Sequence, residues 1–446
     1  MFLSTLVFGG VQEYMRNLSF FLGGLSFFVL SGGRRVSLLI LLFIPFLLML
    51  LLQMLPLPFS LLSLLSDRRV EIATSLDNLI KSGQNFLTIT YSPYITFKEL
   101  LLHATGFFVA LVLYKLLDRR RLIALLYFFI ALAIFESLYG IYQFVLQYPG
   151  VLWEKVHFAG TARGTFINRN HFAGFLELTT FLTIAYMLSL GRWKEEFSFK
   201  NLISSEHMYK QMVLLFISAT MVTALLLSMS RGGIVSFLGG LVFFVTLIAI
   251  KLRSYRHKKE GGVYEYVLLL LLSLVVIVMS WASIGYIQSR FMKAEEDAQS
   301  RISVWLDSIK GIKEHPLLGT GGGTFEYAYY MYKERNKESL IYEHAHNDYI
   351  EYAVETGLVG AFLFFLPFFL FLFLGIRKLI SLNLRKSSLE FFSLLACITG
   401  IFSILVHSLV DFNLQIPANL YLAYALVGIG GAILHDRLAL SHTSGG

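Results

Sequence analysis

The residues best suited to chemistry lie between long apolar runs, and the first group centres on an arginine. Ser230-Arg231-Gly232-Gly233 joins two such runs through a very short turn. Glycines let the backbone turn with positive φ, and a helix that starts there directs its positive end outward. A guanidinium in this position suits a phosphate or pyrophosphate, which it grips with two parallel hydrogen bonds. The plainer interpretation is an arginine that only reaches lipid headgroups, and position alone favours it.

A second arginine and a histidine follow along the chain. Arg301 stands four residues before Trp305, on a stretch with one apolar stripe at helical spacing; taken alone, it is most simply a solvated charge. His346-Asn347 precedes another long apolar run, so we expect the imidazole just outside the start of a membrane helix. A neutral imidazole in that position can take a proton from a sugar hydroxyl.

The acids beside this histidine have a plainer use. Asp348 and Glu351 have the spacing of a capping box, which predicts that they start the helix. His344, His346 and Asp348 also suggest a metal cluster, but no further ligand set is evident. We therefore predict neither a metal nor a cofactor.

Two further polar segments stand at the ends of apolar runs. Asn168-Arg169-Asn170-His171 combines amides, a guanidinium and an imidazole, and it fits a sugar site and a helix cap equally well. His407 and Asp411 lie close to Asn413 and Gln415. For this last group a polar turn at the membrane surface is the simpler interpretation.

Membrane helices must position these residues. Of the 446 residues 56% are hydrophobic, and continuous apolar runs of about 20 residues predict membrane helices rather than strands. Clusters of Lys and Arg occupy alternate gaps between the runs and mark them as cytoplasmic, while the polar segments above occupy the other gaps. The net charge of +8 is thus a topology signal and not a sign of nucleic-acid binding. The expected spans lie near 1–9, 12–30, 36–55, 100–117, 122–145, 173–190, 212–228, 233–251, 265–284, 348–376, 390–409 and 418–434.

We predict an all-α polytopic membrane protein with about twelve spans in a single domain, 1–446. A large external loop, 285–345, interrupts it and contains an amphipathic helix from Ala294 to Glu314, which His315-Pro316 ends. The next segment, Gly319-Thr320-Gly321-Gly322-Gly323, predicts an irregular, flexible turn. The single cysteine, Cys397, lies inside an apolar run and is expected to be a small core residue.

At these residues the chain resembles the O-antigen ligase and polymerase superfamily of bacterial membrane glycosyltransferases. The ligase pattern is His, then Asn, Ser or Gln, nine residues, and Gly-X-X-Gly; here His346-Asn347 is followed by nine residues and Gly357-Leu358-Val359-Gly360. Arg231 matches the family arginine at the start of a span, and Arg301 matches the arginine on the large periplasmic loop. The resemblance is tightest over 160–420, and it extends to Gln53-Met54-Leu55-Pro56-Leu57-Pro58, to Asn168-Arg169-Asn170-His171 and to His407-Ser408-Leu409-Val410-Asp411.

The resemblance implies a twelve-helix protein of the bacterial inner membrane with its site facing the periplasm. It implies inverting, metal-independent transfer of a glycan from undecaprenyl pyrophosphate to an acceptor hydroxyl on lipid A-core. Arg231 and Arg301 would bind the pyrophosphate, and His346 would act as general base. Asn347, Asn168-Arg169-Asn170-His171 and Asp411 are expected to bind substrate.

Two other functions stay open. A polymerase of the same superfamily would use a second lipid-linked glycan as acceptor. A secondary transporter would need coupling charges or broken helices near the midplane, whereas acids deep in the apolar runs are few, chiefly Glu136 and Glu177. The gathering of polar motifs on one side favours surface chemistry of the ligase type.

Overall fold

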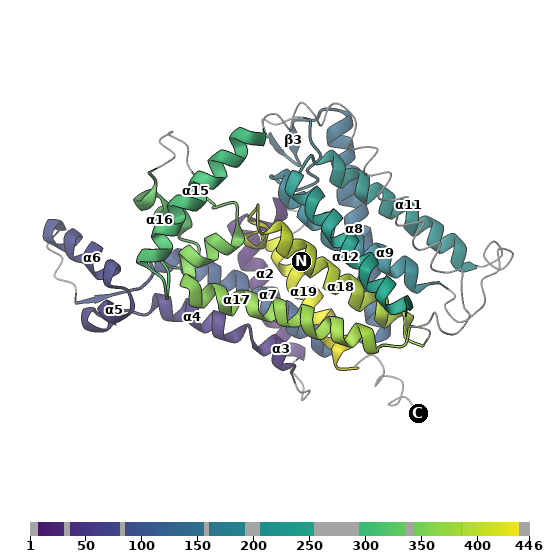
Figure 1. Cartoon of the computed structure of the whole chain (residues 1–446), viewed down its shortest axis with the longest axis horizontal. Coiled ribbons are helices and arrows are strands. Elements are labelled where there is room, and N and C mark those ends of the chain that lie inside the picture. Colours follow the sequence, from purple (N-terminus) through teal and green to yellow (C-terminus); the bar gives the residue numbers. More distant parts are fainter. Residues whose placement is uncertain are drawn as a thin grey trace.

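The computed structural model describes residues 8–30, 36–80, 85–155, 160–191, 206–253, 294–334, 342–384 and 386–436, which form a bundle of helices (Figure 1). The helices are α2 (Glu13–Leu30), α3 (Leu38–Leu41), α4 (Ile44–Met54), α5 (Phe59–Leu65), α6 (Asp67–Ile80), α7 (Pro93–Leu116), α8 (Arg119–Val145), α9 (Arg169–Ser189), α11 (Glu206–Leu227), α12 (Arg231–Arg253), α15 (Ala294–Glu314), α16 (Phe325–Tyr332), α17 (Asp348–Ser381), α18 (Ser388–His407) and α19 (Pro417–Leu434). Two short antiparallel pairs join β1 (Leu57–Pro58) to β2 (Phe86–Leu87) and β3 (Gly150–Val151) to β4 (Glu154–Lys155).

Eight of the described helices are long and apolar enough to cross a membrane: α7, α8, α9, the Met208–Leu227 part of α11, α12, α17, α18 and α19. The chain is therefore an all-α polytopic membrane protein, as predicted. The expected span near 36–55 is instead divided into α3 and α4, and Pro45 stands in the first turn of α4, where its missing N–H is tolerated. The span expected at 265–284 and most of that at 1–9 lie outside the described residues, so the number twelve stays a prediction.

Three helices form the centre of the bundle. Almost every side chain of α9, α18 and α19 is buried, that of Cys397 included. Other helices keep an exposed apolar face, such as Phe369 and Phe373 on α17, and lipid tails are apolar enough to cover such faces. The interiors of the three central helices are therefore surrounded by protein rather than by lipid.

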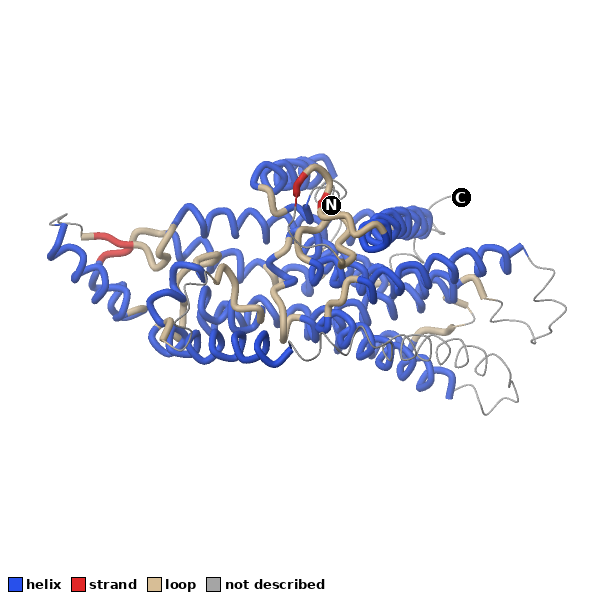
Figure 2. Tube along the Cα trace, turned by 90° about the horizontal axis from the view of Figure 1, so that it is seen from above, coloured by secondary structure: helices blue, strands red, loops and turns tan. Residues whose placement is uncertain are grey.

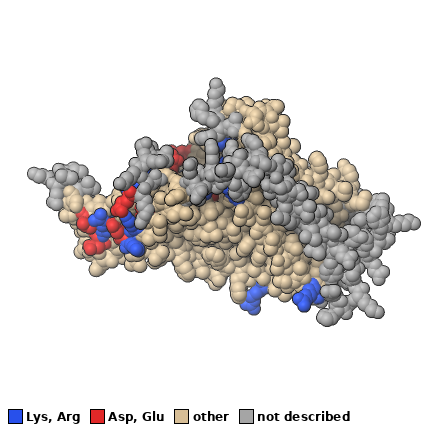
Figure 3. All heavy atoms as spheres, turned by 45° about the horizontal axis from the view of Figure 1, so that its top comes forward, with Lys and Arg blue, Asp and Glu red and all other residues tan. Residues whose placement is uncertain are grey.

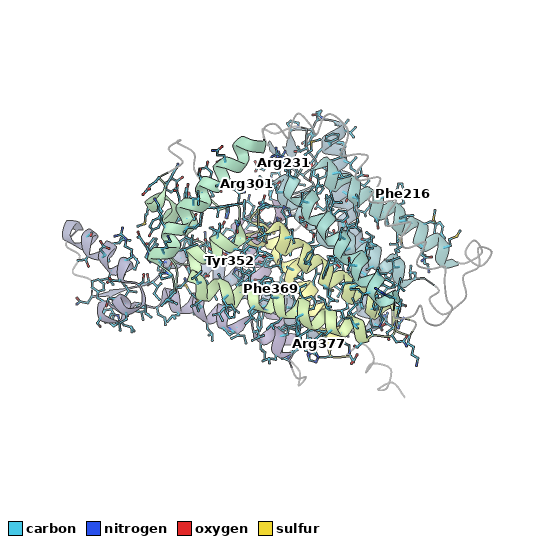
Figure 4. All side chains as sticks on the ribbon, viewed as in Figure 1. Phe216, Arg231, Arg301, Tyr352, Phe369 and Arg377 are labelled. Carbon is cyan, nitrogen blue, oxygen red and sulfur yellow. The ribbon has the colours of Figure 1, made fainter. Side chains whose placement is uncertain are left out.

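The basic clusters and the polar motifs lie at opposite ends of the bundle. At one end Lys251 Nζ donates to the carbonyl of Ile380 at 2.6 Å, and Arg119 Nη1 lies 3.6 Å from Glu390 Oε1. Arg377 shares this end, whereas Arg231 and Arg301 lie at the other (Figure 4). On the face shown in Figure 3, some basic side chains stand at the lower edge of the molecule, and others lie among acidic side chains at its left. This separation is the one that the charge pattern of the sequence predicts.

Helix α17 is broken at Gly357, where φ is 66° and ψ is 178°. The break frees carbonyl groups that the segment 319–323 satisfies: Gly321 N donates to Glu355 O at 2.8 Å, and Thr320 N donates to Val354 O at 3.0 Å. Gly319, Gly321 and Gly323 all have positive φ, which only glycine adopts without strain. The segment predicted to be a flexible turn is therefore mostly buried and held by hydrogen bonds, because it completes a broken helix.

Gln53 at the end of α4 locks the same junction. Its side-chain nitrogen donates to Leu318 O at 2.6 Å and to Glu355 O at 2.8 Å, and its oxygen accepts from Gly322 N at 3.0 Å. The side chain is completely buried. Gln53, a polar residue inside the apolar run 36–55, thus stabilises the break in α17 by hydrogen bonds to its backbone.

An arm that comprises residues 57–80 and 85–87 extends away from the bundle (Figures 1 and 2). His315 attaches it, because Nδ1 hydrogen-bonds Ser66 Oγ at 2.9 Å and Nε2 hydrogen-bonds Tyr91 Oη at 2.9 Å. Arg68 Nε adds an ion pair with Glu314 Oε2 at 2.8 Å. The end of α15 therefore fixes both the arm and the break in α17.

Candidate functional site

The polar motifs converge on one short segment, residues His407–Phe412, which we call the 407–412 turn. It follows α18, whose last residue is His407. The carbonyl of His407 accepts hydrogen bonds from the amides of Val410 at 3.0 Å and of Asp411 at 3.1 Å, which closes the turn. This geometry leaves the Val410 carbonyl and the Asp411 carboxylate for partners from other elements.

Arg301 reaches this turn from α15. Its Nη1 donates to Val410 O, and its Nη2 lies 3.9 Å from Asp411 Oδ2. Four residues later Trp305 Nε1 donates to Ala345 O at 2.8 Å, which ties α15 to the segment before α17. The Arg301 side chain keeps 30% of its surface exposed, so the guanidinium is anchored and still accessible.

His346 approaches the same carboxylate from the start of α17. Its φ of 51° lies in the left-handed region, which is strained for a residue other than glycine. Its Nδ1 lies 3.7 Å from Asp411 Oδ1, and 30% of the side chain is exposed. Strain of this kind persists only where the surroundings enforce it, and the bonds of the next residues do so here.

Asn347 and Asp348 supply those bonds. Asn347 is the N-cap of α17, since its Oδ1 accepts from Ile350 N at 3.1 Å, and its Nδ2 donates to Leu409 O at 2.9 Å. Asp348 Oδ2 accepts from Ser408 Oγ at 2.6 Å. The prediction that Asp348 and Glu351 form the cap of this helix is therefore wrong. Asn347 caps the helix, and Asp348 instead holds the 407–412 turn.

The segment 168–171 meets the turn from α9. Asn168 is the N-cap of α9 and accepts from Asn170 N at 2.9 Å. Asn170 Nδ2 donates to Asp411 Oδ2, and His171 Nε2 lies 3.6 Å from Asp411 Oδ1. This segment was expected to form either a sugar site or a helix cap, and the contacts of Asn168 are those of a helix cap. Arg169 is half-buried at the first position of the helix.

Arg231 begins α12 beside the same turn. The hydroxyl of Ser230 accepts from Gly233 N at 3.2 Å and so caps the helix. Gly232 packs so closely that a Cβ there would lie 2.9 Å from Val410 Cγ2 and 3.0 Å from the His407 ring. Figure 4 shows Arg231 and Arg301 in the same part of the molecule. The two arginines and the histidine singled out by the sequence thus surround one turn.

A comparison with protein families bears on this arrangement. Residues 216–365 match the family model described as O-antigen ligase. Over this stretch the chain is similar to the O-antigen ligase family. This family implies glycosyltransferase activity of the ligase or polymerase type on lipid-linked glycans. The chain matches no curated protein.

The ligase family domain contains Arg231, Arg301 and His346, but Asp411 and the segment 168–171 lie outside the matched residues. The carboxylate that faces both Arg301 and His346 thus comes from beyond the match. Its side chain is only 2% exposed. The Asp411 carboxylate is therefore buried behind its partners, and its role in substrate binding stays a prediction.

The electrostatics of the candidate site centre on this carboxylate. Burial by itself raises the pKa of Asp411, but its interactions with His171 and His346 outweigh burial and hold that pKa well below its usual range. Asp411 is therefore ionised at every pH at which the protein is expected to work. This permanent negative charge faces both His346 and Arg301.

A second imidazole lies close by. His344 stacks on the ring of Phe412, with centroids 3.9 Å apart, and its Nδ1 lies 2.6 Å from Glu351 Oε1. Burial lowers the pKa of His344, but the Glu351 carboxylate outweighs this and raises it. Among the residues that the structure describes, no group of His, Cys, Asp and Glu is arranged to hold a metal ion.

Sequence reasoning missed several residues that build the site. Glu351 accepts from His344 and, at 2.8 Å, from Ala345 N, so it shapes the approach to His346 rather than the first turn of α17. Phe412 contacts the rings of His171, His344 and His346. The only clue to Phe412 in the sequence was its position next to Asp411, because the residues that it contacts are distant along the chain.

Proposed function

We propose that this protein transfers a glycan from undecaprenyl pyrophosphate to an acceptor hydroxyl at the external face of the inner membrane, in the manner of an O-antigen ligase. The acceptor of this reaction is lipid A-core. One observation carries the proposal: Arg301 and His346 share the Asp411 carboxylate, and the Arg231 turn packs against the same residues. Two cations and one base in a single place are what the reaction needs.

The imidazole of His346 supplies the base. Its Nδ1 faces Asp411, which leaves Nε2 for the acceptor hydroxyl. As Nε2 takes the hydroxyl proton, the acceptor oxygen forms a bond to the anomeric carbon. The bond from that carbon to the phosphate oxygen breaks with inversion, and the electron pair leaves with the pyrophosphate.

The arginines stabilise the leaving group. Negative charge grows on the bridging oxygen as the pyrophosphate departs, and guanidinium groups placed beforehand stabilise that charge without reorganisation. Arg301 is anchored through the Val410 carbonyl and keeps part of its surface exposed. Arg231 stands at the positive end of α12, which adds to the attraction for an anion.

Transfer with purified, reconstituted protein and a labelled lipid-linked glycan tests these roles. His346→Ala is expected to abolish transfer, whereas His435→Ala, at the basic end of the bundle beside Ser37, leaves it intact. Substantial turnover by His346→Ala would remove this residue as the base.

Binding of undecaprenyl pyrophosphate tests the arginines separately. Arg231→Ala and Arg301→Ala are each expected to weaken binding, and Arg377→Ala at the opposite end serves as the matched control. Unchanged affinity in both site variants would refute the anion-binding role.

The polymerase is the second candidate, because the family domain covers both reactions. A competition between lipid A-core and a second lipid-linked glycan as acceptors separates the two by product. Transport is less well supported: α17 is broken at Gly357, but the buried acids have fixed partners, such as Glu136 with Thr165 Oγ1 at 2.7 Å. A transporter needs acids that change partners between two states.

A further inference from the structure

A buried acid–histidine pair lies directly below the site and has no part in the mechanism above. Glu177 Oε1 in α9 lies 2.5 Å from His407 Nδ1 at the end of α18, and both side chains are completely buried. Ser403 Oγ donates to the other carboxylate oxygen at 2.7 Å and also lies 2.9 Å from Ser236 O in α12. The pair therefore joins three helices at the point where each approaches the 407–412 turn.

The free edge of the imidazole faces the arginine turn. His407 Nε2 is buried and has no hydrogen-bond partner among the described residues. A Cβ on Gly232 would lie 3.0 Å from both Cδ2 and Nε2 of this ring, so the Gly232 backbone rests against it. Because Arg231 is the preceding residue and starts α12, the ring sets how close Arg231 comes to the turn.

His407 also holds the Val410 carbonyl, which is the hydrogen-bond partner of Arg301. Its carbonyl accepts from the amides of Val410 and Asp411, which orients the Val410 carbonyl toward Arg301. The ring of His407 thus meets one arginine segment, and its backbone holds the anchor of the second.

Stability alone does not explain the pair. Desolvation of a buried carboxylate and imidazole costs about as much as their attraction returns, and an apolar pair of similar volume is often at least as stable. Buried polar pairs specify one geometry of the elements that they join. The geometry specified here is the separation of α12 from the 407–412 turn.

We propose that His407, held by Glu177, is a positioning residue that places Arg231 relative to Arg301 so that both guanidinium groups meet one pyrophosphate. This proposal rests on the proposed function of the two arginines. It requires that the ring stay fixed through Nδ1, since only then does its opposite edge face Gly232.

Three substitutions at His407 test the role of Nδ1. The side-chain nitrogen of Asn occupies nearly the position of Nδ1, whereas that of Gln lies nearer Nε2. His407→Asn is therefore expected to keep the bond to Glu177 and, although it lacks the far edge of the ring, to lose less affinity for undecaprenyl pyrophosphate than the other two variants. His407→Gln and His407→Leu are expected to bind it about tenfold more weakly, the loss that corresponds to one misaligned charge-assisted contact.

A matched pair of glycine variants tests the same distance without removing a polar group. Gly232→Ala places a methyl group between α12 and the turn, and Gly239→Ala adds the same methyl on the same helix where nothing lies within 4 Å. Gly232→Ala is expected to weaken binding about tenfold, with Gly239→Ala unchanged. Thermal unfolding of each variant identifies any that lose the fold, and Gly232→Ala keeps the test valid if His407→Leu is among them.

The outcomes separate this proposal from the proposed function. If Arg231→Ala weakens binding while His407→Gln and Gly232→Ala bind normally, the positioning role is wrong and the anion site stands. If Asn, Gln and Leu at 407 weaken binding equally, the bond through Nδ1 has no specific role and the proposal falls. If Arg231→Ala and Arg301→Ala both bind normally, the anion-binding role in the proposed function fails, and this inference fails with it.

Discussion

Replacing Asp411 by Asn removes the charge that faces His346 and Arg301 while it keeps the size of the side chain. The carboxylate lies 3.7 Å from His346 Nδ1. With an effective dielectric constant of about 20, Coulomb's law gives about 4.5 kcal/mol between an imidazolium and a carboxylate at this distance. His346 keeps 30% of its side chain exposed, so solvent screening reduces this to about 2–3 kcal/mol.

This interaction exists in full only when His346 carries the proton, and therefore it acts on the transition state more than on the bound substrate. Asp411→Asn is expected to lower kcat roughly 30- to 160-fold. Donor binding is expected to stay the same or tighten, because the site gains one net positive charge and Arg301 loses a competing anion.

Initial rates of transfer at saturating and limiting donor measure both quantities. Asp436→Asn is the matched control, since this exposed carboxylate pairs with Lys378 at the opposite end of the bundle. An unchanged kcat would refute the electrostatic reasoning. A loss of donor affinity with kcat retained would show that Asp411 contacts the substrate directly, as the sequence suggested.

Three further predictions concern the frame around the site. Burial lowers the pKa of His315 from 6.5 to about 4, so the folded protein binds fewer protons than the unfolded chain. The attachment of the arm is therefore at full strength above pH 6.5, and it is weakened by about 3 kcal/mol as the pH falls to 4. Faster hydrogen exchange over residues 59–80 at low pH would confirm this, and constant protection would contradict it. Gly357→Ala adds a side chain at positive φ that collides with the backbone of Leu317, and it is expected to destabilise the protein by about 3 kcal/mol or more in thermal unfolding, with Gly239→Ala unchanged. Gln53→Leu removes the side-chain partner of the Leu318 carbonyl and of the Gly322 amide, and it is expected to cost about 3 kcal/mol by the same measurement. An equally stable variant would exclude the locking role.

The sequence predicted the elements well where one physical signal dominates. Continuous apolar runs gave the membrane helices, and the apolar stripe gave α15 with its observed ends, Ala294 and Glu314. The prediction for 36–55 was less accurate, because hydropathy does not register the interruption before Ile44. Hydropathy also missed the break at Gly357, since the apolar pattern continues through it.

The site was predictable as a set of residues but not as a geometry. Arg231 and His346 were singled out by their positions next to helix ends and Arg301 by its place on an amphipathic helix. Their common neighbour is the 407–412 turn, which is far from each of them in sequence. Pairing such as Glu177 with His407 leaves no local pattern, because no periodicity links positions on separate helices. Whether Asn168 and Asn347 cap helices or bind sugars likewise depends on which backbone amide lies nearest.

The junction between Gln53, the glycine-rich segment and the interrupted helix has an evolutionary consequence. The residues that contact the broken backbone come from Gln53, which precedes the matched stretch 216–365, and from within that stretch, so it is not a self-contained module. A chimera that exchanged it between relatives would strand peptide groups in an environment without water to solvate them. Substitutions at position 53 during evolution are therefore expected to be restricted by contacts with residues about three hundred positions away.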